Sequence, residues 1–206
     1  MGVSVKTVVT AMDDPLGLAV GNALEVEEAI HVLEGRGPAD TTALTLRLVA
    51  EMLVLGDLVR DIGEGEARAR GAIESGRALV RFERIVAAQG GRIDLRSRGY
   101  GLPRARVVRT LAARADGFVT GIDALVVGET VRGMGGGRFV QGDLVDPSVG
   151  VRFRAKRGDE IVSGGPLLDV HAADEESAVQ AARKLEGAIG ISREREAPAP
   201  LFLMDD

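Results

Sequence analysis

The sequence contains no cysteine and no tryptophan, and aromatic residues make up only 3% of its 206 residues. The absence of cysteine excludes disulfide bonds, thiolate nucleophiles and cysteine-ligated zinc. No apolar run reaches the ~18 residues of a membrane-spanning helix. The first residues also lack the apolar core and cleavage site of a signal peptide. We therefore expect a cytoplasmic protein that does not contact a membrane.

The charge of the chain limits its partners further. A net charge of −5 argues against nucleic acid as a partner, because a nucleic-acid surface needs clustered positive charge. The chain is 45% hydrophobic and 28% charged, which is typical of a soluble globular protein. Its length is enough to bury one good core, with room for a small second lobe.

Residues 13–35 form the most informative stretch. Proline and glycine disfavour a helix in its first half. Asn22 then stands three residues before Glu25, which is the spacing of a capping box with asparagine as the cap. Apolar residues follow at helical spacing, and Gly35 is placed to end the helix in a left-handed conformation. This pattern predicts a bent loop that leads into a capped helix.

A bent loop beside a carboxylate can also bind a hard cation. Such a loop leaves some carbonyl oxygens outside the hydrogen-bond ladder, and Glu25 on the first helical turn would add a carboxylate to them. From the pattern alone, capping by Glu25 is the simpler interpretation.

The rest of the chain indicates helices first and strands later. The β-branched run Val3–Val9 predicts a buried strand that leads into the bent loop. The glycine-rich, charged segment 90–103 predicts a connection between lobes. Asp116-Gly117 is a hairpin dipeptide between two of the later strands. Helices are expected over 42–55, 64–88 (two, divided at Ser75-Gly76), 123–132 and 174–187, and strands over 107–113, 118–122, 149–155, 160–162, 167–171 and 188–191.

Familiar catalytic motifs are missing. There is no G-x-S-x-G elbow, and His31 and His171 do not have a metal-binding spacing. His31 is expected at the surface, and His171 in a structural role at the end of a strand. Gly135–Arg138 lacks the lysine and hydroxyl of a phosphate loop, so we expect a tight turn there. Residues 158–172 resemble half of a biotinyl or lipoyl domain. Those domains carry a modifiable lysine at the tip of a hairpin, usually beside a methionine. The nearby Lys156 follows an alanine instead, which argues against a role as a carrier domain.

A series of short blocks does carry a family resemblance. PLGLAVGNALEV, AEMLVLG, VAAQGG, ADGFVTGIDA, MGGGR, DPSVGV and PLLDVHA occur in this order. The series resembles the pyrimidine-nucleoside and thymidine phosphorylases, beginning partway along the family's sequence. The resemblance implies an α/β fold. Residues 1–90 would be part of a mixed-sheet α/β domain, 91–102 a connection, and 103–206 a sandwich-like α+β C-terminal lobe.

The resemblance also implies an activity. The family is a homodimeric pentosyltransferase that cleaves a pyrimidine nucleoside, with phosphate as co-substrate, to the free base and pentose 1-phosphate. Its phosphate- and base-binding residues lie upstream of the matching region, so no catalytic or substrate-binding residue is assigned in this chain. A monovalent cation, potassium, would be bound by the backbone carbonyls of Leu16 and Ala19 and by the carboxylate of Glu25.

Three interpretations stay open from the sequence. The chain is an enzyme part, inactive alone, that completes its active site with a missing N-terminal half. Otherwise it is a non-catalytic binding or scaffold protein derived from the family, or a relative that cleaves nucleotide monophosphates. Preference for thymidine or uridine stays open because the base-contacting residues have no counterpart in this chain.

Overall fold

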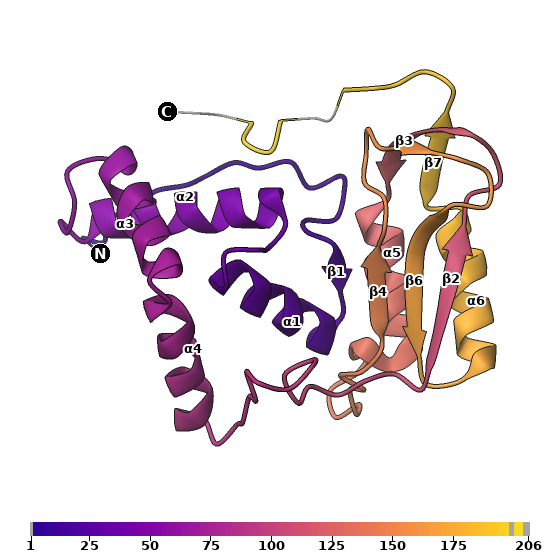
Figure 1. Ribbon diagram of the computed structural model, residues 1–206, viewed down its shortest axis with the longest axis horizontal. Coiled ribbons are helices and arrows are strands. Elements are labelled where there is room, and N and C mark those ends of the chain that lie inside the picture. Colours follow the sequence, from indigo (N-terminus) through magenta and orange to yellow (C-terminus); the bar gives the residue numbers. More distant parts are fainter. Residues whose placement is uncertain (1, 198–199, 204–206) are drawn as a thin grey trace. The chain divides into compact units, whose positions relative to one another are not determined.

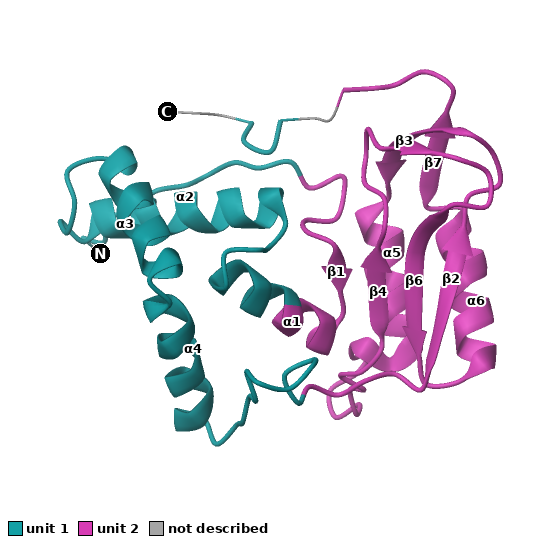
Figure 2. Ribbon diagram, in the orientation of Figure 1, with its two compact units in different colours: residues 1–11, 28–101, 200–206 teal, residues 12–27, 102–199 magenta. Residues whose placement is uncertain are grey.

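The computed structural model describes residues 2–197 and 200–203 and contains both helices and strands (Figure 1). The chain divides into two compact units, coloured separately in Figure 2. Unit 1 consists of residues 1–11, 28–101 and 200–206, and unit 2 of residues 12–27 and 102–199. The mixed α/β class is confirmed, whereas the domain limits of 1–90 and 103–206 stay a prediction. No helix in the described residues is both long and apolar enough to cross a membrane.

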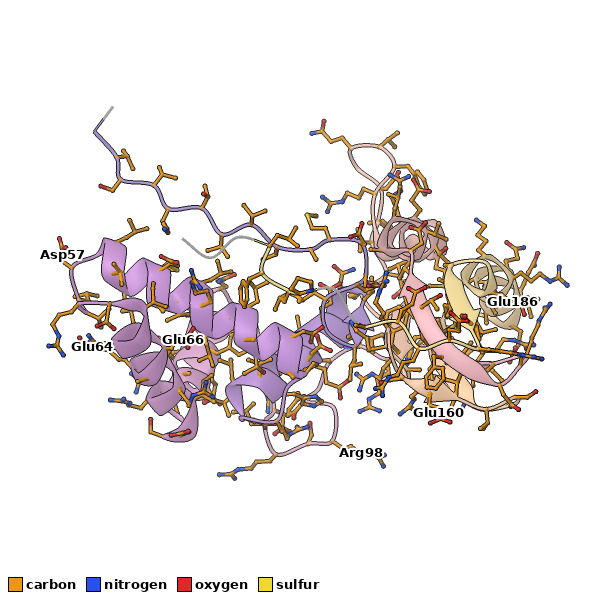
Figure 3. The ribbon with its side chains drawn as sticks, turned by 90° about the horizontal axis from the view of Figure 1, so that it is seen from above. Asp57, Glu64, Glu66, Arg98, Glu160 and Glu186 are labelled. Atoms are coloured by element: carbon orange, nitrogen blue, oxygen red, sulfur yellow. The ribbon has the colours of Figure 1, made fainter. Side chains whose placement is uncertain are left out.

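Unit 1 is built from helices. It contains the second half of α1 (Asn22–Leu33) together with α2 (Ala39–Leu55), α3 (Ile62–Glu74) and α4 (Arg77–Ala88). Gly65 allows α3 to pack closely on α2, because a Cβ at this position would lie 2.8 Å from Ala50. Asp61 caps α3 by accepting a hydrogen bond of 2.8 Å from the backbone N–H of Glu64. Figure 3 labels Glu64 near this connection.

The predicted end of the first helix is confirmed. Gly35 has a φ of 76°, and its N–H donates to the carbonyl of Val32. The N–H of Arg36 reaches back to the carbonyl of His31. These two bonds form a Schellman motif, which satisfies the last carbonyls of the helix and turns the chain away.

The buried strand predicted at Val3–Val9 is wrong. Val3 and Val5 are 75% and 77% exposed, and Val9 is 38% exposed. Pairing at this end of the chain is limited, in the described residues, to an isolated bridge between Thr10 and Phe202. β-Branched residues favour an extended backbone, but their burial requires neighbouring strands and side chains. Val3, Val5 and Val9 lack enough of these neighbours to be buried.

Unit 2 contains two antiparallel sheets, the first half of α1 and, later in the chain, two further α-helices. One sheet has the order β1-β4-β6-β2 and the other β5-β3-β7. The helices are α5 (Ala124–Val131) and α6 (Glu175–Glu186), and buried side chains from both sheets and both helices share one core. The strands are β1 (Ala19–Val20), β2 (Val107–Ala112), β3 (Gly117–Ile122), β4 (Gly150–Phe153), β5 (Glu160–Ile161), β6 (Pro166–Ala172) and β7 (Ile189–Ser192).

The predicted hairpin at Asp116-Gly117 is wrong, although a turn is present. β2 pairs with β6, whereas β3 pairs with β5 and β7, so the two strands lie in different sheets. The backbone of Ala113 bonds to Gly164 and Gly165, and the carboxylate of Asp116 accepts from the N–H of Ser163. These contacts direct the chain from one sheet to the other before β3 begins.

Candidate functional site

The bent loop predicted from the sequence is anchored within unit 2. The carboxylate of Asp14 accepts a 2.6 Å hydrogen bond from the N–H of Ile122 and pairs with Arg157 at 2.6 Å. The side chains of this ion pair are only 21% and 25% exposed. The carbonyl of Asp13 accepts from the N–H of Ala124. The start of the loop is therefore fixed to the segment that joins β3 to α5.

A lysine binds the middle of the same loop. Lys156 Nζ donates to the carbonyl of Gly17 at 2.7 Å and also to the carbonyl of Pro15. Pro15 and Gly17 are buried, and Gly17 has a φ of 68°. Asp159 holds the backbone of Lys156 in a turn, because its carboxylate accepts from the N–H of Lys156 and its own N–H donates to the carbonyl of Lys156.

The end of the loop joins the edge of a sheet. The N–H of Phe153 donates to the carbonyl of Leu18 at 2.8 Å, and the register places Ala19 opposite Arg152. Alternate residues of an antiparallel pair exchange hydrogen bonds, so Ala19 occupies a non-hydrogen-bonded position. Its carbonyl therefore faces away from β4, at the edge formed by β1.

The first turn of α1 is capped differently from the prediction. Asn22 is the first helical residue, and its side-chain amide donates to the carbonyl of Gly136 at 2.8 Å, so its predicted capping role is wrong. Glu25 accepts a 2.9 Å hydrogen bond from the N–H of Gly21, the residue before the helix. A carboxylate in this position also interacts favourably with the positive end of the helix dipole.

The three predicted cation ligands thus have different surroundings. Leu16 is 41% exposed, Ala19 is 5% exposed, and Glu25 is exposed with its carboxylate turned to Gly21. The ligand set stays a prediction. Sequence reasoning missed Lys156 as a neighbour of the loop, because no local pattern connects residues so far apart in the chain.

A cavity of about 520 Å³ lies beside the loop within unit 2. Its wall includes Asp13, Thr120 and Asp123, together with Arg157, which is the one basic side chain among the described residues that line it. Arg157 is already paired with Asp14 and lies 3.8 Å from Glu196. The cavity therefore offers no uncompensated positive charge to a phosphate.

A second polar cluster lies on the four-stranded sheet. Asp169 accepts hydrogen bonds from Thr110 at 2.7 Å and from Arg154 at 2.8 Å. Burial alone would raise the pKa of Asp169, but these two bonds and the positive charge of Arg154 outweigh it and lower the pKa. Burial, followed by the charge of Arg152, lowers the pKa of His171 below 6.5. In the described residues, no group of three or more acidic or histidine side chains is placed to hold a metal.

Comparisons with known proteins support the family resemblance that the short blocks of sequence indicated. Residues 118–192 match a family model described as the pyrimidine nucleoside phosphorylase C-terminal domain. A thymidine phosphorylase from Burkholderia cenocepacia is 38% identical over 203 residues, which cover 98% of this chain. The chain belongs to the pyrimidine-nucleoside and thymidine phosphorylase family. A pyrimidine-nucleoside phosphorylase from Staphylococcus epidermidis is 33% identical over 198 residues, or 96% of the chain. The chain spans 46% of the length of each of these two phosphorylases.

Proposed function

We propose that this chain is the C-terminal portion of a pyrimidine-nucleoside phosphorylase and that it does not cleave nucleosides by itself. The observation that carries the proposal is the match of 98% of this chain to only 46% of a thymidine phosphorylase. In the complete enzyme the chain would take part in phosphate-dependent cleavage of thymidine or uridine to the free base and pentose 1-phosphate. Unit 2 would be the sandwich-like terminal lobe of that enzyme.

The chemistry of the reaction supports inactivity of the isolated chain. Displacement at the anomeric carbon builds positive charge on the sugar and negative charge on the departing base. Catalysis therefore needs a phosphate positioned as the nucleophile and hydrogen-bond donors directed at the base. Such positioning supplies on the order of 7–11 kcal/mol of barrier lowering. The cavity beside the loop does not offer this, because its arginine is already neutralised by Asp14.

An assay of the purified chain tests the proposal. The chain is incubated with thymidine or uridine, phosphate and potassium, and release of the free base is followed. The complete Burkholderia cenocepacia thymidine phosphorylase serves as the positive control. We expect no release above background from the chain alone. Turnover at an ordinary enzymatic rate that survives repeated purification away from host phosphorylase would contradict the proposal.

The neighbouring genomic sequence separates the remaining alternatives. The DNA just upstream is searched for a reading frame that encodes a glycine-rich loop with lysine and serine. If such a frame is found, its product is co-expressed with this chain. Release of base from thymidine or uridine by the pair supports the enzyme-part interpretation. Release from a nucleoside monophosphate instead supports the nucleotide-cleaving relative. Absence of such a frame favours the non-catalytic binding or scaffold protein.

A further inference from the structure

The two units differ in how much hydrophobic core they contain. Unit 2 has a cluster of seventeen buried residues that draws on both sheets and on α5 and α6. In the described part of unit 1, the buried hydrophobic side chains are Ile30, Val32, Leu46, Ala50, Ala69 and Tyr100. Helices in proteins are stabilised mainly by packing of their apolar faces. The helices of unit 1 therefore surround an incomplete core.

Helix α2 carries apolar side chains on two opposite sides. Ala50 is buried, and Gly65 of α3 packs closely on it. Leu48, Met52 and Leu55 lie on the other side, spaced by four and three residues, and all three are exposed. A helix that is apolar on several sides is normally buried on several sides. These three residues, called the α2 stripe below, are the side of α2 that lacks a cover in unit 1.

Two further parts of unit 1 leave apolar surface uncovered. None of the twelve residues that the structure describes in α4 is buried, although Leu79, Phe82 and Val86 recur at helical spacing. Val3 and Val5 are also exposed. A two-fold dimer buries one self-complementary patch, whereas a neighbouring layer of chain covers apolar surface on several elements at once. The spread of these side chains over three elements favours such a layer over a second copy of the chain.

The family provides a source for this layer. The chain spans 46% of the length of each of the two phosphorylases, so the rest of the family's sequence is longer than the matching region. The partner of the α2 stripe has to be apolar, because burial of a polar group without a hydrogen bond costs free energy. We propose that the α2 stripe packs against an apolar surface of the part of the phosphorylase sequence upstream of the matching region. This holds whether that part precedes this sequence in one chain or belongs to a separate chain.

This inference rests on the proposed function and adds the surface through which the two parts meet. Amide exchange tests it in a protein of complete length. The part of the Burkholderia cenocepacia thymidine phosphorylase that precedes the matching region is joined to this chain in one polypeptide. Exchange is measured in the joined protein and in this chain alone, in peptides that cover residues 43–58.

Two substitutions are compared in both proteins. Met52→Gln replaces a methionine of the α2 stripe by a polar side chain of similar shape. Leu125→Gln in α5 of unit 2 is the matched control, because Leu125 is 71% exposed and Met52 is 69% exposed. In this chain alone, neither substitution should change the exchange of residues 43–58, since both side chains are exposed to water.

We expect residues 43–58 to exchange about tenfold more slowly in the joined protein than in this chain alone. Met52→Gln should remove most of this protection, and Leu125→Gln should keep it. Three results would overturn the inference. These are equal exchange in the two proteins, equal exchange of the two variants in the joined protein, and protection in this chain alone that rises with its concentration. The last result would identify a second copy as the partner.

Release of free base by the joined protein, measured separately, distinguishes this inference from the proposed function. Release from thymidine and phosphate without slower exchange of residues 43–58 would overturn the inference and leave the proposed function standing. Slower exchange that Met52→Gln removes, without release of base, would support the inference and count against the proposed function.

Discussion

Lys156 Nζ lies 2.7 Å from the carbonyl oxygen of Gly17, although 139 residues separate the two in the sequence. The following residue, Arg157, forms an ion pair with Asp14 over a separation of 143 residues. The stretch that most clearly resembles the phosphorylases is therefore held by the turn after β4. The conformation of this loop therefore depends on Lys156 and Arg157, two residues that lie far from it in the sequence.

The close approach of β1 and β4 predicts a strong effect at Gly21. A Cβ there would lie 2.5 Å from the carbonyl of Val149 and 2.7 Å from Gly150, and the φ of 130° is one that side chains rarely allow. Gly21→Ala should lower the free energy of unfolding by more than about 1 kcal/mol, because backbone has to move. Urea unfolding measures the loss.

Gly128 provides the matched control for this substitution. It lies within α5, and a Cβ at this position meets nothing within 4 Å. Gly128→Ala should raise stability by about 0.5–1 kcal/mol, because alanine loses less backbone entropy in a helix. Equal effects of the two substitutions would contradict the close packing at Gly21.

The hydrogen bonds to Asp169 predict a pH-dependent contribution to stability. Its carboxylate side chain is only 8% exposed and is bonded to Thr110 and Arg154. Asp169→Asn should cost about 1–3 kcal/mol at neutral pH, since Arg154 loses its charged partner. Glu160→Gln removes an exposed charge and should change stability little.

The sign of the pH dependence follows from the lowered pKa of Asp169. The folded pKa is below the ordinary value of 3.8, so the stabilisation is present above 3.8 and is lost as pH falls through the folded pKa. The difference in urea midpoint between Asp169→Asn and the unchanged protein should therefore become smaller as the pH is lowered from neutral to pH 3. A constant gap across this range would show that the carboxylate contributes through packing alone.

Glu25 should stabilise the start of α1. Glu25→Ala removes the acceptor for the Gly21 N–H and a negative charge from the positive end of the helix, at a cost of about 0.3–1 kcal/mol. Glu25→Gln keeps a hydrogen-bond acceptor and should therefore lose less stability than Glu25→Ala. Both variants are compared by urea unfolding with and without potassium. Potassium-dependent stability that disappears in both would instead support the ligand set of Leu16, Ala19 and Glu25.

The connection between the helical and strand-rich parts should be cut first by protease. Arg92 and Arg104 are exposed in a segment without regular structure, whereas Tyr100 is buried and bonded to Glu34. Limited trypsin digestion should cut after arginines of residues 90–106, and Tyr100→Phe should accelerate this cleavage. Earlier cutting inside residues 107–122 would count against a connection at this point.

Local signals in the sequence were sufficient for many of the elements. Asp123 does cap α5, accepting from the N–H of Val126 at 3.0 Å. The division of residues 64–88 into two helices at Ser75-Gly76 is confirmed, as is the left-handed Gly35. Such features depend on a few neighbouring residues, so a short window of sequence contains the interactions that determine them.

Pairing and burial needed the tertiary structure. The sequence by itself determined the family, most helices and strands, and the bent loop before α1. Only the fold decided that β2 pairs with β6, that Val3, Val5 and Val9 are exposed, and that Asn22 bonds to Gly136. It alone also placed Lys156 on the loop carbonyls. Each of these outcomes depends on groups that are distant in sequence, and short-range patterns contain no information about which distant surfaces will meet.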